Sequence, residues 1–189
     1  PVQWADEALK DPIELLNDHA HLEKKAATNA LMLLQRWPSG QSPTEWVQAL
    51  TSVSRDEALH LSQVTRLLKE YGGEYSRQHD SHYASDLHTL VRLGDGIREL
   101  LDRLMISALI EARSCERFAL LGEAANDPKL KKLYKTLWAS EKEHYKAFHD
   151  LAYMILEQDI VQVRWKEMVA QEGEIIKKQP KGCKIHSWV

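Results

Sequence analysis

Cysteines and long apolar segments are both scarce in this sequence. The two cysteines, Cys115 and Cys183, are too few for a disulfide framework and are typical of a reducing, cytosolic compartment. The chain contains no Cys-x-x-Cys pair, which an iron–sulfur module would need. No apolar run approaches the roughly 20 residues of a membrane span, and no signal peptide opens the chain. We therefore expect a cytoplasmic protein without a membrane segment.

Glycine and proline are also few, with eight and six residues in 189, and they cluster where long helical patterns would end. No stretch alternates between apolar and polar residues, so no segment competes as a strand. The sequence therefore predicts long helices separated by short Gly- or Pro-containing turns. The predicted helices span about 12–37, 43–71, 96–125, 128–158 and 160–178.

The order of these segments predicts an all-α fold, a four-helix bundle with an additional C-terminal helix. We expect one domain over 1–189, with a bundle core of about 12–158. The connection 74–96 is the irregular part and contains a possible short helix at 86–93. The last ten residues, 180–189, are expected to form a loose tail.

Two Glu-x-x-His pairs lie on the second and fourth predicted helices. Glu57 and His60 occur in SRDEALH, and Glu141 and His144 occur in SEKEHYKAF. A single pair carries little weight in a chain with nine histidines. Two pairs on alternate helices are what a dimetal site in a bundle core needs, together with one Glu from each remaining helix.

The first and third predicted helices each present a Glu on an apolar face. Small or apolar residues dominate the positions three, four and seven residues from Glu23 and Glu111, whereas the rivals Glu14 and Glu116 have charged neighbours. Four buried carboxylates are prohibitive without compensation, and two divalent ions would supply it. The predicted ligands are Glu23, Glu57, His60, Glu111, Glu141 and His144.

Carboxylates and imidazoles without a thiolate favour iron or manganese over zinc or copper. Asp56, directly before Glu57, is placed to accept the outer N–H of a ligand histidine, whereas the matching position in the second motif is Ser140. His19 and Cys115 each lie one turn from a predicted ligand. For both, ordinary core packing is the alternative to a role beside the metals.

Four segments carry a resemblance to a known family. They resemble the bacterial tRNA hydroxylases, within the ferritin-like di-iron carboxylate superfamily, and the resemblance covers about 12–158. The segments are DHAHLEKKAA (18–27), SRDEALH (54–60), LIEARSCERF (109–118) and SEKEHYKAF (140–148).

This resemblance implies a ferritin-like fold and a non-haem di-iron monooxygenase. Such an enzyme hydroxylates the isopentenyl group of 2-methylthio-N6-isopentenyladenosine in tRNA next to the anticodon. The implied requirements are two iron ions, O2, and electrons from a reductase or ferredoxin. Small residues beside the predicted ligands would leave room for O2 and a prenyl group, although close helix packing explains them equally: Ala26, Ala27, Ser107, Ala108 and Cys115.

The net charge of −3 argues against general nucleic-acid coating but not against a local basic patch for the tRNA anticodon stem-loop. The segment KLKKLYK carries four lysines on the first turns of the fourth helix, where cations oppose the helix dipole. An anionic partner or a solvated lysine face would each account for them. The lysines are Lys129, Lys131, Lys132 and Lys135, and further candidates are Lys24, Lys25, Arg113 and Arg117.

Three other functions are compatible with a dimetal bundle. The first is a ferritin-like iron oxidase or storage protein, and the second is a peroxide-reducing protein. The third is a purely structural bundle with vestigial ligands, which the complete set of six predicted ligands disfavours.

Overall fold

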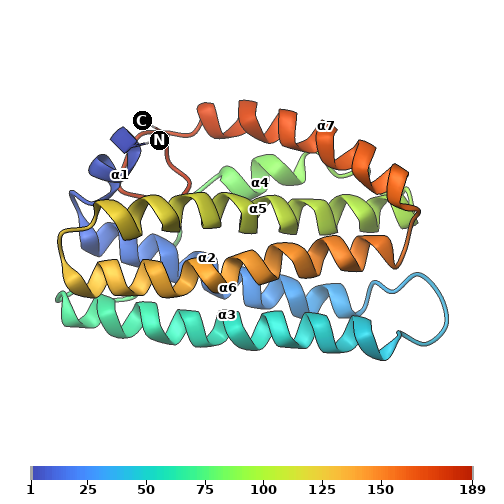
Figure 1. Ribbon diagram of the computed structural model, residues 1–189, viewed down its shortest axis with the longest axis horizontal. Helices are drawn as coiled ribbons and strands as arrows, with labels where there is room; N and C mark the ends of the chain where they lie inside the picture. Colours follow the sequence, from blue (N-terminus) through green and yellow to red (C-terminus); the bar gives the residue numbers. More distant parts are fainter. Residues whose placement is uncertain (1, 189) are drawn as a thin grey trace.

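The computed structural model describes residues 2–188, which are mainly helical (Figure 1). Four long helices lie side by side, and three others flank them. In chain order the elements are α1 (Val2–Ala8), α2 (Pro12–Leu34), α3 (Thr44–Glu70), α4 (Tyr83–His88), α5 (Ile97–Ala124), α6 (Pro128–Tyr153) and α7 (Gln158–Lys177).

Helices α2, α3, α5 and α6 form the predicted four-helix bundle. α2 packs against α3, α5 packs against α6, and α3 also contacts α6. α7 is the predicted additional helix, and it lies over α5 on the outside of the bundle, as α4 does (Figure 1). The all-α bundle with an additional C-terminal helix is thus confirmed.

The starts of α2 and α6 are encoded locally. The Asp11 carboxylate accepts hydrogen bonds from the backbone N–H groups of Ile13 and Glu14 at 3.1 and 3.0 Å. Asp127 caps α6 in the same way, and a proline follows each aspartate. Proline suits the first helical position because its missing N–H would have no partner there. These caps explain why both boundaries follow from the sequence.

Hydrophobic side chains fill the bundle as two clusters. One includes Leu33 and Leu104, and the other includes Leu16 and Phe118. Full burial of such a side chain contributes roughly 1.5–3 kcal/mol. Along each long helix, the Glu and His residues singled out above fall between the positions that belong to the two clusters. A polar layer therefore crosses the interior, with apolar core on both sides.

Two short helices, α1 and α4, differ from the expectations. α4 spans Tyr83–His88 rather than 86–93. The backbone N–H of Arg92 donates instead to the carboxylate of Asp102 at 2.9 Å, so the chain turns there rather than continuing as a helix. α1 was not predicted; its Trp4 is fully buried and α1 packs against α5.

The segment 180–188 is packed against the bundle, so the expected loose tail is wrong over this range. Ile185 is fully buried, and its backbone N–H donates to Asp18 at 2.9 Å. The indole N–H of Trp4 donates to the Ser187 hydroxyl at 3.0 Å. These partners are more than 160 positions away in the sequence, so no local pattern reveals the contact.

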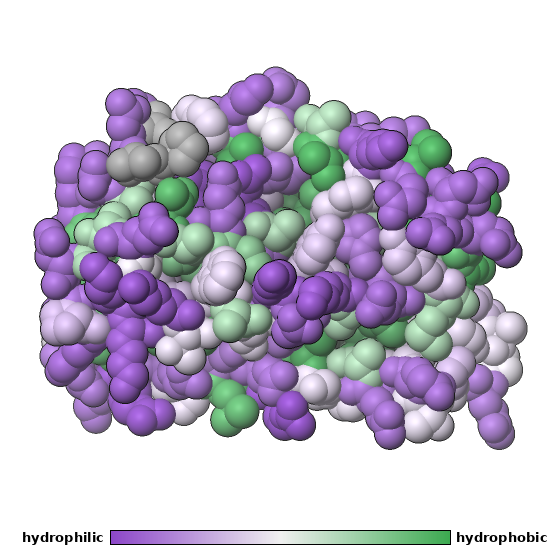
Figure 2. Space-filling model, viewed as in Figure 1, coloured by the Kyte–Doolittle hydropathy of each residue, from purple (hydrophilic) through white to green (hydrophobic). Residues whose placement is uncertain are grey.

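The face of the molecule in Figure 2 is covered mainly by hydrophilic side chains, with apolar residues in small, scattered areas. Among residues 2–188, no helix is both long enough and apolar enough to cross a lipid bilayer. The apolar side chains are instead used mainly inside the bundle.

Asp102 fixes two outer segments to α5. Its fully buried carboxylate accepts hydrogen bonds from Arg92 at 2.7–2.9 Å and from Arg164 of α7 at 2.8 Å. Burial opposes ionisation, but the bonds from Arg92 and then Arg164 lower the pKa of Asp102 below its ordinary value. The ion pair therefore contributes stability above the ordinary Asp pKa and loses it as the pH falls through the lowered value.

We expect Asp102→Ala to lower the free energy of unfolding by about 3 kcal/mol at neutral pH, because the substitution leaves two arginines without their shared partner. The difference from wild type should shrink in acid, where Asp102 is protonated in both states. Urea unfolding at several pH values measures this. Asp95→Ala, which removes an exposed carboxylate from the same region, should change stability by less than about 1 kcal/mol. An equal effect of the two variants would contradict this role of Asp102.

Candidate metal centre

The six predicted ligands meet in the polar layer of the bundle. Their side chains come from all four long helices, and each residue is at most 5% exposed. Helical spacing explains the convergence, because a Glu and a His three positions apart share one helix face. The residues are Glu23 of α2, Glu57 and His60 of α3, Glu111 of α5, and Glu141 and His144 of α6.

The cluster divides into two overlapping sets of four residues. Within each set, one ligand atom per residue lies within 4.8 Å of the others. Glu57 and Glu141 belong to both sets, whereas the other four residues belong to one set each. This arrangement would suit two cations, with Glu57 and Glu141 able to contribute to the binding of either one. The first set is Glu23, Glu57, His60 and Glu141, and the second is Glu57, Glu111, Glu141 and His144.

Both histidines direct Nδ1 towards the carboxylates. Nδ1 of His60 lies 3.4–3.6 Å from oxygens of Glu23, Glu57 and Glu141. Nδ1 of His144 lies 2.6 Å from Oε1 of Glu57, yet neither atom has a hydrogen-bond partner. A buried nitrogen and a buried oxygen that both carry lone pairs and lie this close together are positioned to bind the same cation.

The electrostatics of the cluster also fit a pair of cations. Burial, followed by the charge of Glu23, raises the pKa of Glu57 well above its ordinary value. Burial and Glu141 do the same to Glu111, and burial with Glu57 raises the pKa of Glu141 to about 7. The raised pKa values mean that Glu57, Glu111 and Glu141 bind protons more readily when no cation balances their negative charge. Oxygen and nitrogen donors of this kind suit a divalent transition metal, so the residues present fit a dimetal centre.

Two residues predicted to lie beside the ligands do so. His19 Nε2 lies 2.6 Å from Oε1 of Glu23, which fixes that carboxylate. Asp56 Oδ2 lies 3.7 Å from the outer nitrogen of His144, beyond direct hydrogen-bond distance, and Asp56 also accepts from Arg55 at 2.9 Å. Both contacts connect a polar residue to a candidate ligand from outside the cluster.

Cys115 lies near the cluster as a neutral thiol. Burial raises its pKa to about 12, and the charges of Glu141 and Glu111 act in the same direction. Its Sγ lies 3.8 Å from the carbonyl oxygen of Trp138 on α6. These contacts are those of a side chain packed between α5 and α6.

A cavity of about 510 Å³ between α2, α4 and α5 reaches one candidate ligand, Glu111. Glu111 lies in its wall beside apolar side chains such as Ile106 and Ile110, and Lys24 and Lys25 are among the lining residues. Of the small residues expected to leave room for a substrate, Ala26 and Ser107 line this cavity, whereas Ala27, Ala108 and Cys115 do not. The cavity therefore combines an apolar interior with positive charge and a candidate metal ligand.

The lining of this cavity includes residues that the sequence analysis did not single out for this role. Arg103 comes from α5, His88 from α4 and His186 from the C-terminal segment. No motif identifies them, because they come together only when α4 and the C-terminal segment fold over the bundle.

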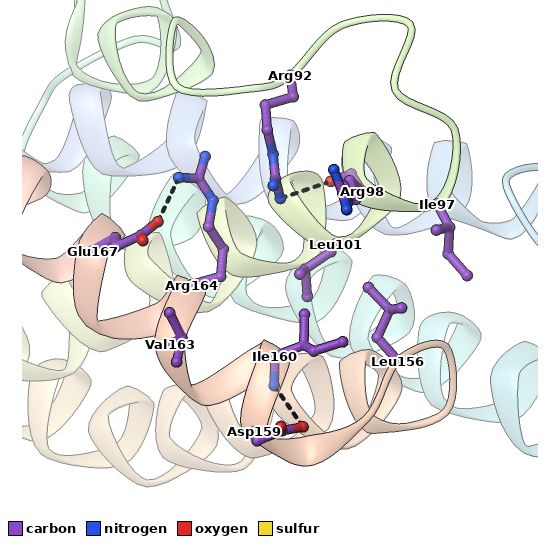
Figure 3. Close-up of a pocket in the computed structure, with 10 residues that line it drawn as sticks. All are labelled: Arg92, Ile97, Arg98, Leu101, Leu156, Asp159, Ile160, Val163, Arg164 and Glu167. Atoms are coloured by element: carbon purple, nitrogen blue, oxygen red, sulfur yellow. Dashed lines mark hydrogen bonds and ion pairs between the residues drawn. The ribbon is translucent and has the colours of Figure 1, made fainter.

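A second cavity, of about 670 Å³, lies between the starts of α5 and α7 (Figure 3). Arg92, Arg164 and Glu167 line it together with apolar residues, and none of the six candidate ligands does. Ile97 in its wall precedes Glu111 by 14 positions on α5, which corresponds to about 21 Å. This cavity is therefore separate from the six candidate ligands.

Two arginines considered as RNA contacts are used inside the protein. Arg113 donates hydrogen bonds to Glu172 of α7 at 2.7 and 2.9 Å. Arg117 is 2% exposed and lies over the ring of Trp4 at 4.0 Å. Neither is a free surface cation. The lysines predicted at the start of α6 do not line the cavity; Lys129 pairs with Glu70 at 2.7 Å, and Lys132 and Lys135 are exposed.

We expect about two metal ions per chain and an unequal response to loss of shared and unshared ligands. Glu57→Ala should remove most of both ions, because its carboxylate belongs to both sets of ligands. Glu23→Ala should leave about one ion, since it disrupts only the first set. Metal analysis of purified protein measures the stoichiometry. Glu143→Ala, an exposed position two residues after Glu141, should retain both ions, and equal losses in all three variants would contradict the assignment.

The chain resembles known proteins along its whole length. The family model described as tRNA-(MS[2]IO[6]A)-hydroxylase (MiaE) matches residues 1–187. A Pseudomonas putida protein named tRNA 2-(methylsulfanyl)-N(6)-isopentenyladenosine(37) hydroxylase is 35% identical, over 100% of this chain and 90% of the relative. A Salmonella typhimurium protein of the same name is 27% identical, over 100% of this chain and 86% of the relative.

A solved structure shares the fold. It is described as Protein 43 with aldehyde deformylating oxygenase activity from Synechococcus, and it matches with a TM-score of 0.89 and 32% sequence identity. The match covers 98% of this chain and 92% of that one. Together with the family model and the two full-length relatives, the bundle and its buried cluster of Glu and His side chains lead to one conclusion: the chain belongs to the MiaE family of tRNA hydroxylases.

Proposed function

We propose that this protein hydroxylates the isopentenyl group of 2-methylthio-N6-isopentenyladenosine in tRNA, next to the anticodon. The observation that carries this proposal is the cavity that opens onto Glu111. Its volume of about 510 Å³ lies within the usual range for small-molecule sites. Its apolar wall suits a prenyl group, Lys24 and Lys25 suit the phosphates of an RNA, and family membership supports the substrate class.

The metal pair in this proposal is iron, held by the six clustered carboxylate and imidazole side chains. Two bound iron ions would supply the redox chemistry by which one oxygen atom of O2 enters an allylic C–H bond and the other leaves as water, with two electrons and two protons taken up. The hydrogen bond between His19 and Glu23 holds one of these ligands in place, and the carboxylate of Asp56 lies 3.7 Å from the outer nitrogen of His144. The apolar cavity wall excludes water around the prenyl group.

Each turnover consumes two electrons, and in this scheme they come from outside the chain. We assign their delivery to a separate reductase or ferredoxin. The reaction is placed in the cytoplasm because its substrate is tRNA. An iron oxidase or a peroxide-reducing protein would use the same metals, but a cavity for an organic group beside one ligand favours hydroxylation.

Iron-loaded protein, given substrate tRNA, O2 and a reductant, should convert the prenylated adenosine into a product heavier by one oxygen atom. Mass spectrometry of digested tRNA measures this, and isotopically labelled O2 should place the label in the product. Glu111→Ala and His144→Ala should abolish turnover because each removes a candidate metal ligand. Glu116→Ala, an exposed position on the same helix as Glu111, should retain it.

Two outcomes would contradict the proposal in different ways. Full iron content and activity in both Glu111→Ala and His144→Ala would exclude these residues as ligands. Unchanged prenylated adenosine together with rapid iron mineralisation would instead favour the iron-storage function.

The double variant Lys24→Ala/Lys25→Ala should weaken binding of tRNA, because these lysines line the cavity that receives the modified base. The slope of log affinity against log salt concentration should become shallower by roughly one unit for each phosphate that the variant no longer binds. Fluorescence anisotropy with a labelled anticodon stem-loop at several salt concentrations measures both quantities.

Lys132→Ala/Lys135→Ala is the matched comparison, because it removes the same charge from the predicted surface at the start of α6. We expect a smaller loss of affinity from this variant if those lysines contact only the outer part of the RNA. Weakened binding in the α6 variant alone would move the RNA-binding surface away from the cavity.

A further inference from the structure

The cavity that Glu111 lines lies between two helices that do not pack closely. Within the part of the chain that the structure describes, α2 packs against α3 and α5 against α6, but the backbones of α2 and α5 do not approach each other in this way. The two helices are antiparallel, because the end of α2 shares a hydrophobic cluster with the start of α5, and the start of α2 shares another with the end of α5. Each lines the cavity over more than two turns, Leu22 to Met32 on α2 and Arg103 to Glu111 on α5. The cavity is therefore elongated along the helices, with Glu111 at one end of its α5 wall.

One hydrogen bond crosses this gap between the helices. The side-chain amide of Asn29 on α2 donates from Nδ2 to Oγ of Ser107 on α5 at 2.9 Å, and both residues line the cavity. The Ser107 hydroxyl donates in turn to the backbone carbonyl of Arg103 at 3.0 Å. Because its single proton is used there, Ser107 can only accept from Asn29. The amide nitrogen of Asn29 therefore faces Ser107, and the amide oxygen points the other way.

The remaining polar groups of the Asn29 side chain are open. Oδ1 accepts no hydrogen bond from any residue in 2–188, and the second N–H of Nδ2 donates none. Asn29 is only half-buried, and its Oδ1 keeps accessible surface, unlike enclosed unpartnered atoms such as the Tyr134 hydroxyl oxygen. Asn29 thus presents one acceptor and one donor, side by side and in a fixed orientation, to a group in the cavity.

One helical turn of apolar wall separates the Asn29 amide from Glu111. Ser107, the partner of Asn29, precedes Glu111 by four positions, which corresponds to about 6 Å along α5. Ala26 on α2 and Ile110 on α5 line the cavity over this turn. A short apolar group bound beside them would have the polar atom to which it is attached level with Asn29.

The modified base matches both this spacing and this pattern of donor and acceptor. In an N6-isopentenyl adenine, four bonds separate N6 from the terminal carbons of the prenyl group, a reach of roughly 5 Å. With the prenyl group beside Ala26 and Ile110, N6 comes level with Asn29. The base keeps one N6–H donor next to the acceptor N7, and an asparagine side chain pairs with this edge of adenine through its oxygen and its nitrogen.

We propose that Asn29 hydrogen bonds to the modified adenine through Oδ1 and Nδ2 and is a specificity-determining residue of the cavity. Ser107 is a positioning residue, because it fixes the orientation of the Asn29 amide. The inference rests on the proposed function and extends it from the prenyl group to the base that carries it. A base with an acceptor in place of the N6–H group would face Oδ1 with a second acceptor and bind more weakly.

The test compares two prenylated anticodon stem-loops that differ at one atom. One contains 2-methylthio-N6-isopentenyladenosine, and the other carries the same prenyl group on an oxygen in place of N6, which removes the N–H donor. Both are titrated into iron-loaded protein in the absence of O2, so that binding is measured without turnover. Wild type should bind the N6-linked stem-loop about 5–30-fold more tightly, the effect of one hydrogen bond.

Three variants locate the source of this discrimination. Asn29→Leu should bind both stem-loops with nearly equal affinity, because leucine is similar in size and has no polar side-chain atom. Ser107→Ala keeps Asn29 but removes the partner that orients its amide, so part of the discrimination should be lost. Asn17→Leu is the matched control: Asn17 also lies on α2 and donates to a serine, Ser76, at 3.0 Å, but it does not line the cavity, so the wild-type ratio should be retained.

Iron content and thermal unfolding of each variant identify any loss of fold. Full discrimination by folded Asn29→Leu protein would overturn the inference. So would a wild type that binds both prenylated stem-loops equally while rejecting one without the prenyl group, and in both cases the proposed function would stand. If Asn29→Leu does not fold, unchanged discrimination by Ser107→Ala would overturn it instead. A wild type that does not prefer a prenylated stem-loop to an unprenylated one would contradict the proposed substrate, and the inference with it.

Discussion

Mutual repulsion among four buried carboxylates is the constraint on which this structure depends. Glu23, Glu57, Glu111 and Glu141 are each at most 4% exposed and lie in two overlapping sets of ligand atoms. Burying such charges is unfavourable unless cations balance them. The hydrophobic clusters on both sides of this layer supply the stability that the layer does not, and they keep the four helices at the separation that a dimetal site needs.

Glu23 and Glu111, the two candidate ligands that do not belong to a Glu-x-x-His pair, have different surroundings. On α2, Glu23 is held by His19, whereas Glu111 on α5 lies in a cavity wall. The bundle thus supplies the candidate metal ligands, while α4 and the C-terminal segment complete the cavity next to one of these ligands, Glu111. The structural match to a protein described as having aldehyde deformylating oxygenase activity extends over 98% of this chain, so it includes these covering elements as well as the bundle. The function therefore has to be argued from the site rather than from the fold.

The sequence predicts the bundle well because its signals are local. Asp-Pro pairs mark the starts of α2 and α6, and apolar neighbours distinguish the buried Glu111 from the exposed Glu116. The expectations that were wrong have the same cause, which is a tertiary contact that no local sequence pattern reveals. The short helix ends early because Asp102 binds the backbone of Arg92, and the C-terminal segment is buried through contacts with distant residues. Arg117 is charged and near a ligand turn, yet it packs beneath the surface against Trp4.

The sequence by itself determined the fold class and the six candidate ligands, because helical periodicity and the cost of a carboxylate on an apolar face can be evaluated along one helix at a time. Only the tertiary structure decided which carboxylates are shared, which imidazole nitrogens face them, and where the cavity opens. The presence of His186 and Glu111 in the wall of the same cavity is also a tertiary result. These features depend on distances between helices and on chain segments far apart in sequence, and such distances are set by packing rather than by local spacing.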